Sequence, residues 1–320
     1  MNLENVTETS RAIREMAAAL GVDAVGFARA VRLDGDALRL QDWLSSGYHA
    51  DMVWMEGHFE KRVDPTLLVE GTKSVVVALF SYKPAEVQSS NLPQIAKYAY
   101  GTDYHIVVKD RLWELLKAIQ KKYPEVEGRP FVDSAPVMER AWAVRAGLGW
   151  IGKNSLLLNK DLGSFFFIGT LMLNVELDYA TPLKSSCGGC TRCIEACPTR
   201  AIVWPKVVDA RKCISYHTIE NRGIIPDSIK PLIGNRVFGC DTCQDVCPWN
   251  VRVAPHNHQE LASRQAILSS SLEDWTALNE DRFAEIFRKS AVKRAKYSGF
   301  TRNMQIVVEN QASSRIDKCE

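Results

Sequence analysis

Eight of the nine cysteines in this 320-residue chain lie between positions 187 and 247. Residues 187–198 read C-x2-C-x2-C-x3-C-P, a spacing with which cysteine thiolates bind [4Fe–4S] clusters. Residues 240–248 repeat its last part, C-x2-C-x3-C-P, but Val237 stands where the first cysteine of the repeat would be. Cys213 can supply the missing thiolate. The spacing therefore predicts two clusters that carry electrons.

In two-cluster motifs the last cysteine of a run reaches the neighbouring cluster. We therefore expect two crossed ligand sets: Cys187, Cys190, Cys193 and Cys247 on cluster 1, and Cys197, Cys213, Cys240 and Cys243 on cluster 2. Two all-cysteine zinc sites would use the same number of thiolates, but zinc motifs rarely show this spacing followed by proline. Cys319 belongs to neither set.

Composition and charge exclude several classes of protein. The chain is 46% hydrophobic and 24% charged with a net charge of +2, which is ordinary for a globular protein. Its longest apolar stretches, 74–82 and 164–175, are too short or too interrupted to span a membrane. No secretory signal pattern is present at the N-terminus. We expect a cytoplasmic monomer without membrane contact, where clustered thiols bind metal rather than form disulfides.

Hydrophobic periodicity predicts an α+β chain in three parts. Helices are expected over 9–20, 38–46, 103–122 and 136–146, and strands over 22–29, 73–82 and 164–177. The alternation indicates an α/β or α+β domain up to about residue 178, and we expect an α/β domain at 1–178. A ferredoxin-like domain at 179–255 and a mainly helical basic segment at 256–320 follow.

The basic segment carries six Lys and Arg residues and no acid between residues 287 and 302, with Tyr297 and Phe300 among them. Such a run suits contact with nucleic-acid phosphates and stacking on bases. A solvated helix face is the alternative interpretation.

Glycines at 147–152 match G-x-G-x-x-G. A dinucleotide site needs a strand before this motif and a helix after it, whereas here a helix precedes and a strand follows. We expect a turn at which the backbone approaches a neighbour closely.

Motifs along residues 10–305 resemble those of the epoxyqueuosine reductases, enzymes of queuosine synthesis in tRNA. The matching segments are E-K-R at 60–62, Y-A-Y-G-T-D-Y-H at 98–105, V-D-S at 132–134, E-R at 139–140, A-G-L-G-W-I-G-K-N at 146–154, C-I-S at 213–215, I-G-N-R at 233–236, G-C-D-T-C-Q at 239–244 and S-A-V-K-R at 290–294.

The resemblance implies a cobalamin enzyme with two [4Fe–4S] clusters, whose cobalamin domain is similar to that of reductive dehalogenases. It implies reduction of epoxyqueuosine to queuosine at the wobble position of tRNA, the last step of queuosine synthesis. A low-potential donor would feed the clusters, and the clusters would feed cob(I)alamin. The sequence has no D-x-H-x-x-G motif that would offer cobalt a lower histidine ligand.

The resemblance also implies roles for single residues. Asp133 would be the proton donor, so we expect its apolar neighbours to raise its pKa above the ordinary value of about 3.9. A helix N-cap is the alternative role for Asp133. The residues expected around the corrin are Arg62, Asp133, Lys153, Asn154 and Ser215. The residues expected to hold tRNA are Arg140, Arg222, Lys293, Arg294 and Arg302.

Three other functions remain open at this point. One is a dehalogenase-like cobalamin reductase of a small molecule, against which the basic segment and the missing export signal argue. The second is a non-catalytic iron–sulfur carrier, which would not need the V-D-S and G-K-N motifs. The third is a nucleic-acid-binding module with structural clusters, which would not take up cobalamin. Many members of the family continue into helical repeats, of which residues 256–320 resemble at most a remnant.

Overall fold

The structure is a computed structural model that describes residues 3–316, so Cys319 lies outside the described residues. The helices are α1 (Leu3–Ala19), α2 (Asp34–Ser45), α3 (Phe59–Val63), α4 (Tyr104–Lys122), α5 (Glu139–Arg145), α6 (Arg192–Glu195), α7 (Lys230–Ile233), α8 (Thr242–Asp245), α9 (Gln265–Ser269), α10 (Leu272–Thr276), α11 (Glu280–Ile286) and α12 (Lys296–Ile316). The strands are β1 (Ala24–Arg29), β2 (Ser74–Ser81), β3 (Gln94–Ile95), β4 (Gly128–Phe131), β5 (Trp150–Ile151), β6 (Leu157–Leu158), β7 (Phe166–Leu173), β8 (Ile202–Trp204), β9 (Val207–Val208) and β10 (Arg236–Phe238).

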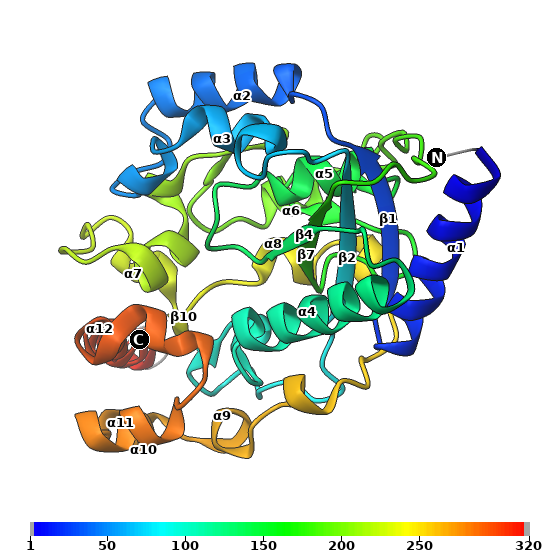
Figure 1. Ribbon diagram of the computed structural model, residues 1–320. Helices are drawn as coiled ribbons and strands as arrows, with labels where there is room; N and C mark the ends of the chain where they lie inside the picture. The colour runs from blue at the N-terminus through cyan, green and yellow to red at the C-terminus, as the bar shows by residue number, and fades with distance from the viewer. Residues whose placement is uncertain (1–2, 317–320) are drawn as a thin grey trace.

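A four-stranded sheet in the order β1-β2-β7-β4 forms the centre of the N-terminal part (Figure 1). Every neighbouring pair in it is antiparallel. The α+β class expected for the chain is therefore confirmed. The narrower α/β expectation for residues 1–178 is corrected, because helices alternate with these strands without linking parallel neighbours.

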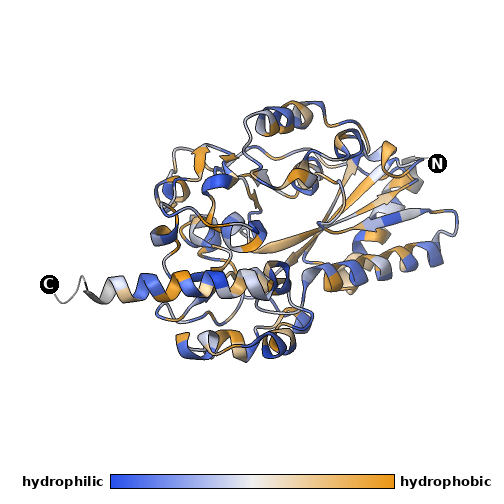
Figure 2. Ribbon diagram, turned by 90° about the vertical axis from the view of Figure 1, so that its left-hand side faces the viewer, coloured by the Kyte–Doolittle hydropathy of each residue, from blue (hydrophilic) through white to orange (hydrophobic). Residues whose placement is uncertain are grey.

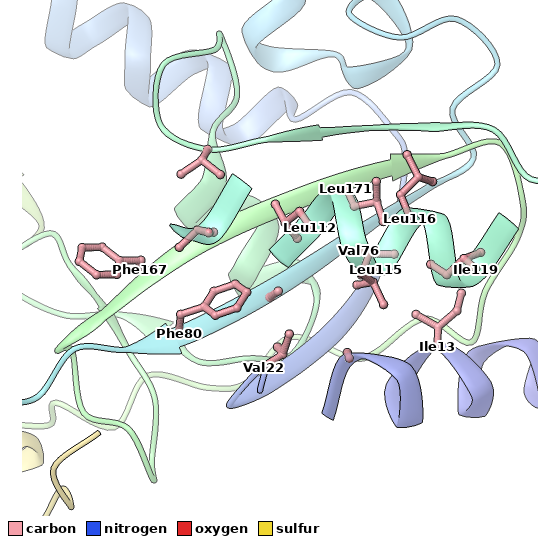
Figure 3. Close-up of a cluster of buried hydrophobic side chains, with 14 of the residues drawn as sticks. Ile13, Val22, Val76, Phe80, Leu112, Leu115, Leu116, Ile119, Phe167 and Leu171 are labelled. Carbon is pink, nitrogen blue, oxygen red and sulfur yellow. The ribbon is translucent and has the colours of Figure 1, made fainter. Parts of the chain in front are cut away.

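Strand β2 is buried along its whole length because helices cover both faces of the sheet. Val76 and Phe80 pack with Leu112 of α4 and Ile13 of α1 (Figure 3). Val75, Val77 and Leu79 alternate with them and pack against α2 and α5 on the opposite face. This period of two is what a strand buried on both faces requires.

The predicted elements match the observed ones closely where the periodicity is long. The helix expected at 103–122 is α4, and Asp103 is its N-cap, accepting a hydrogen bond from the His105 backbone N–H at 3.0 Å. The helix expected at 136–146 is shorter, Glu139–Arg145. Turns at Val132–Ser134 and Ala135–Val137 occupy the residues before it.

The cysteine-rich segment and the C-terminal helices complete the molecule. Helices α6 and α8, one within each cysteine run, pack against each other. Helices α9 to α12 share a hydrophobic cluster with residues 95–100 and 237–238. The outer part of α12 extends away from the body (Figure 2). No helix within residues 3–316 is long and apolar enough to cross a membrane.

Candidate active site

A cavity of about 2300 Å³ opens beside the sheet, between its covering helices, the cysteine-rich segment and residues 290–294, which precede α12. Ordinary small-molecule pockets hold about 300–1,000 Å³. This cavity therefore has room for a large cofactor together with part of a substrate.

The cavity brings together many of the residues that the sequence singled out. The predicted site residues in its wall are Arg62, Asp133, Arg140, Asn154, Cys197, Cys213, Ser215, Cys240, Cys243, Lys293 and Arg294. Within the described part of the chain, the wall does not include Lys153, Arg222, Arg302, Cys187, Cys190, Cys193 or Cys247. The cysteines expected on cluster 2 thus border the cavity, and those expected on cluster 1 lie beyond it.

The thiols fall into two neighbourhoods. Burial raises the pKa of Cys247, and Cys187 and Cys190 lie near enough to raise it further. Burial likewise raises the pKa of Cys213, with Cys240 and Cys197 as its thiol neighbours. Each neighbourhood contains cysteines from both runs, 187–197 and 240–247.

Asp133 lies in a strained turn directly after the edge strand β4. Its φ of 52° is in the left-handed region, which a non-glycine residue occupies at a cost of about 1–3 kcal/mol. Its side chain is 56% exposed, toward the cavity. The N-cap of α5 is Met138 without a side-chain cap, so Asp133 does not cap that helix.

Two neighbours on α4 hold the Asp133 carboxylate. Tyr104 Oη donates a hydrogen bond of 2.5 Å to Asp133 Oδ2, and His105 Nε2 lies 3.2 Å from the same oxygen. Burial by the cavity wall raises the pKa of Asp133, but these two hydrogen bonds outweigh it and leave the pKa below its usual value. The expected rise is therefore wrong, because apolar sequence neighbours did not reveal partners from another element.

Glu139 is a site residue whose role sequence reasoning missed. Its Oε1 accepts a hydrogen bond of 2.5 Å from the backbone N–H of Asp133. Burial, reinforced by the charge of Asp133, raises the pKa of Glu139 to about 8. Next to it, Arg140 donates to the backbone oxygen of Ser155 at 2.5 Å. The E-R pair at 139–140 was the available signal.

His105 was also missed. Its Nδ1 lies 2.8 Å from Asp103 Oδ1, so the imidazole sits between two carboxylates, Asp103 and Asp133. Burial disfavours the charged imidazole, but hydrogen bonds to these carboxylates dominate and raise the pKa of His105 to about 9. The signal was the D-Y-H triplet at a helix start.

Three buried polar atoms in the cavity wall have no hydrogen-bond partner among residues 3–316: Arg62 Nε, Trp150 Nε1 and Ser155 Oγ. Unpaired buried polar groups are costly, so they indicate a missing polar ligand. A corrin presents a ring of amide side chains that can pair with such atoms. The residues present therefore fit cobalamin.

Other predicted positions serve local structure. Asn154 Nδ2 donates to the backbone oxygen of Cys243 at 3.4 Å, which ties the G-K-N motif to the second cysteine run. Lys153 accepts, through its backbone oxygen, a bond from Lys206 N–H. A Cβ on Gly149 would lie 2.0 Å from the backbone oxygen of Leu158, so the expected close backbone approach is confirmed.

Two of the five arginines and lysines expected to hold tRNA donate their side-chain hydrogen bonds to the protein itself. Arg302 donates to the backbone oxygens of His217, Asn221 and Gly223 at 2.7–2.9 Å. Arg222 donates to those of Ile219, Arg294 and Ala295.

Arg294 is also held within the protein, but it stays at the cavity. Its guanidinium pairs with both oxygens of Glu220, and its side chain is 55% exposed.

Comparison with known proteins gives consistent matches. A family model described as "Epoxyqueuosine reductase QueG, DUF1730" matches residues 62–134, and one described as "4Fe-4S double cluster binding domain" matches residues 186–250. The epoxyqueuosine reductase of Cyclobacterium marinum is 48% identical over 97% of this chain and 100% of its own length. That of Escherichia coli is 38% identical over 96% of this chain and 82% of its own length.

Solved structures agree with these sequence matches. An epoxyqueuosine reductase crystallised with an epoxyqueuosine-modified tRNA-Tyr stem loop superposes with a TM-score of 0.87 and 31% identity. The superposition covers 95% of this chain and 81% of that one. A much weaker likeness, with a TM-score of 0.47 and 15% identity, extends to a catabolic reductive dehalogenase. With near full-length identity of up to 48% to curated members, this chain belongs to the epoxyqueuosine reductase family.

Proposed function

We propose that this chain reduces epoxyqueuosine to queuosine at the wobble position of tRNA, as the last step of queuosine synthesis. The observation that carries the proposal is the single cavity that collects Asp133, the orphaned polar atoms and four cysteines of the iron–sulfur motif. An acid, a cofactor cradle and an electron supply meet there. Family membership supports the choice of substrate.

The proposed cofactors are cobalamin and two [4Fe–4S] clusters. Arg62, Trp150 and Ser155 would hold the corrin amides, with Asn154 and Ser215 also in the wall. Bound there, cobalamin supplies a strongly reducing, nucleophilic cobalt centre. The tyrosine and histidine at the start of α4 keep the Asp133 carboxylate at the cavity surface.

The crossed cysteine sets give electrons a route. Cluster 1 would be bound by Cys187, Cys190, Cys193 and Cys247, and cluster 2 by Cys197, Cys213, Cys240 and Cys243. Cys190 is exposed, so an external low-potential donor can reach the first cluster. The second set borders the cavity and would pass electrons onward. We further propose that the enzyme is a cytoplasmic monomer, in three parts at 1–178, 179–255 and 256–320.

The proposed tRNA surface is narrower than the basic segment. Lys293, Arg294 and Arg140 line the cavity, where they can meet an anticodon loop that brings its modified base inside. Arg222 and Arg302 would not contact tRNA themselves. They would support this surface indirectly, by holding its backbone in place.

The test is an anaerobic reaction of the reconstituted enzyme with cobalamin, a low-potential reductant and tRNA carrying epoxyqueuosine. Nucleosides from the digested tRNA are then weighed by mass spectrometry. We expect loss of one oxygen atom, and no loss when cobalamin is omitted or when Asp133 is replaced by Asn. Intact epoxyqueuosine in the presence of bound cobalamin and reduced clusters would contradict the proposal.

A further inference from the structure

Three side chains form a line of polar contacts, one hydrogen bond and one ion pair, that ends at the cavity. Asp103 Oδ1 lies 2.8 Å from His105 Nδ1, and His105 Nε2 lies 3.2 Å from Asp133 Oδ2. All three residues line the cavity. Asp103 and His105 come from the start of α4, whereas Asp133 follows β4, so only the fold assembles the line.

The proposed reaction consumes two protons. Two C–O bonds of the epoxide break and one C=C bond forms. Two electrons from the low-potential donor enter, and the oxygen leaves as water after gaining two protons. A single carboxyl group can hold only one of these protons at a time, so Asp133 must be loaded and then reloaded.

Asp133 is not the group that stores a proton. Hydrogen bonds from His105 and Tyr104 overcome the effect of burial and keep its pKa below the usual value, so it is ionised at neutral pH. His105, with a pKa of about 9, is protonated at neutral pH. These pKa shifts and the 3.2 Å distance assign the pair as a charged imidazole beside an ionised carboxylate.

The other groups around the line favour this state. Burial and the charge of Asp133 raise the pKa of Tyr104 strongly, so its phenol keeps its proton and only orients the carboxylate. Glu139, whose pKa burial raises to about 8, is protonated at neutral pH and adds no negative charge beside Asp133, whereas Arg140 and Arg294 place positive charge near it. The His105 side chain is 38% exposed, so solvent can return a proton to it.

We infer that His105, held by Asp103, is the proton reservoir of the reaction and loads Asp133 for each of the two protonations. His105 transfers its Nε2 proton to Asp133 Oδ2, Asp133 passes that proton to the departing oxygen, and solvent reprotonates His105. His105 acts through Asp133 and is therefore a positioning and relay residue. The inference rests on the proposed function, and it adds the source of the protons.

The test compares four holoenzymes: wild type, His105→Gln, Asp103→Asn and His256→Gln. Asparagine caps helices as well as aspartate does, so Asp103→Asn keeps the start of α4 while it removes the charge beside the imidazole. His256 is absent from the cavity wall and serves as the matched histidine control. Absorbance of the clusters and of bound cobalamin verifies that each variant is assembled.

Two measurements are made on each protein. NMR of the histidine side chains gives the pKa of His105 without any turnover. Single-turnover kinetics with epoxyqueuosine tRNA give the rate and its pH profile, and the wild-type reaction in the same series tests the proposed function separately.

We expect His105 to titrate near pH 9 in wild type and closer to its ordinary value of 6.5 in Asp103→Asn. The rate of Asp103→Asn should begin to fall at correspondingly lower pH. His105→Gln should lose about 10²-fold in rate, within the range of general acid catalysis, with tRNA affinity unchanged. Imidazole added to a fifth holoenzyme, His105→Ala, should restore part of the rate.

The inference is overturned by any one of three results. These are a His105 pKa near 6.5 in wild type, a rate for His105→Gln close to that of His256→Gln, or a pH profile of Asp103→Asn that does not move. Because the NMR titration needs no tRNA, a His105 pKa near 6.5 would rule out His105 as the proton reservoir even if the substrate proves to be different.

Discussion

The backbone N–H of Asp133 donates a hydrogen bond of 2.5 Å to Oε1 of Glu139. This bond joins the turn after β4 to the first residue of α5. Because Asp133 has a φ of 52°, the turn is strained and needs partners that hold it. Glu139 therefore holds Asp133 through its backbone N–H, independently of the Tyr104 hydrogen bond and the His105 ion pair to the Asp133 side chain.

Replacing Glu139 by Ala should release this turn. We expect the single-turnover rate to fall about 10-fold, because small displacements of a reacting group are costly, while tRNA affinity stays the same. Glu139→Gln retains an oxygen acceptor and should keep most of the activity. Equal rates for the Ala variant and wild type, measured in single-turnover reactions, would show that the bond does not position Asp133.

Glu139 should also make stability depend on pH. Its pKa is about 8 in the folded protein against 4.5 for the free side chain, so the folded state binds its proton more tightly. The contribution of Glu139 to the free energy of unfolding therefore falls as pH rises from 4.5 to 8. Thermal melts should show Glu139→Gln gaining stability over wild type across this window. A constant difference between the two proteins would contradict the raised pKa.

The cysteine partition can be tested with two double variants. Cys213→Ser with Cys243→Ser removes two ligands of one proposed set and should leave the other cluster, with half of the iron. Cys213→Ser with Cys247→Ser removes one ligand from each set and should disturb both clusters. Iron analysis and electron paramagnetic resonance of the reduced proteins distinguish the two, with Cys319→Ser as the unaffected control. Loss of only one cluster from the protein that carries Cys213→Ser and Cys247→Ser would exclude the crossed assignment.

Ser155 offers a clean test of the cobalamin cradle. Its hydroxyl has no partner among residues 3–316, so Ser155→Ala should not destabilise the protein. Losing one hydrogen bond to the cofactor should weaken cobalamin binding about 2- to 10-fold. Thr170→Val is the matched control, because Thr170 has an equally unpaired buried hydroxyl on β7 outside the cavity wall. Titrations monitored by cobalamin absorbance should show weaker cobalamin binding for Ser155→Ala and unchanged binding for Thr170→Val.

Substitutions at Lys293 and Arg302 should distinguish a residue that contacts tRNA from a residue that stabilises the fold. Lys293→Ala should weaken tRNA binding and reduce its dependence on salt by about one phosphate contact, with the melting temperature unchanged. Arg302→Ala leaves three backbone oxygens without their donor and should cost about 1–3 kcal/mol of stability. Filter binding at several salt concentrations and thermal melts check both. A loss of stability in Lys293→Ala would contradict the proposal that the Lys293 side chain contacts tRNA and does not stabilise the fold.

The sequence by itself determined features that depend on short separations along the chain. The two cysteine runs are visible because cluster binding requires ligands at fixed local spacing. Asp103 is the N-cap of α4 because a short acidic side chain before an amphipathic run satisfies free backbone N–H groups within the next turn. The buried strand β2 follows from its continuous run of apolar residues.

Only the tertiary structure decided what the chemically active residues touch. Asp133 and His105 are separated by 28 positions along the chain and meet because the edge strand β4 ends beside the start of α4. Arg302 has a sequence context typical of a phosphate contact. Its guanidinium instead donates hydrogen bonds to backbone oxygens about 80 residues away along the chain. Charge and pKa depend on distances and burial, which no local pattern specifies. The sequence therefore identified Asp133 and the cysteines but not His105 or the role of Glu139, and the packing of the chain set the protonation states of these groups.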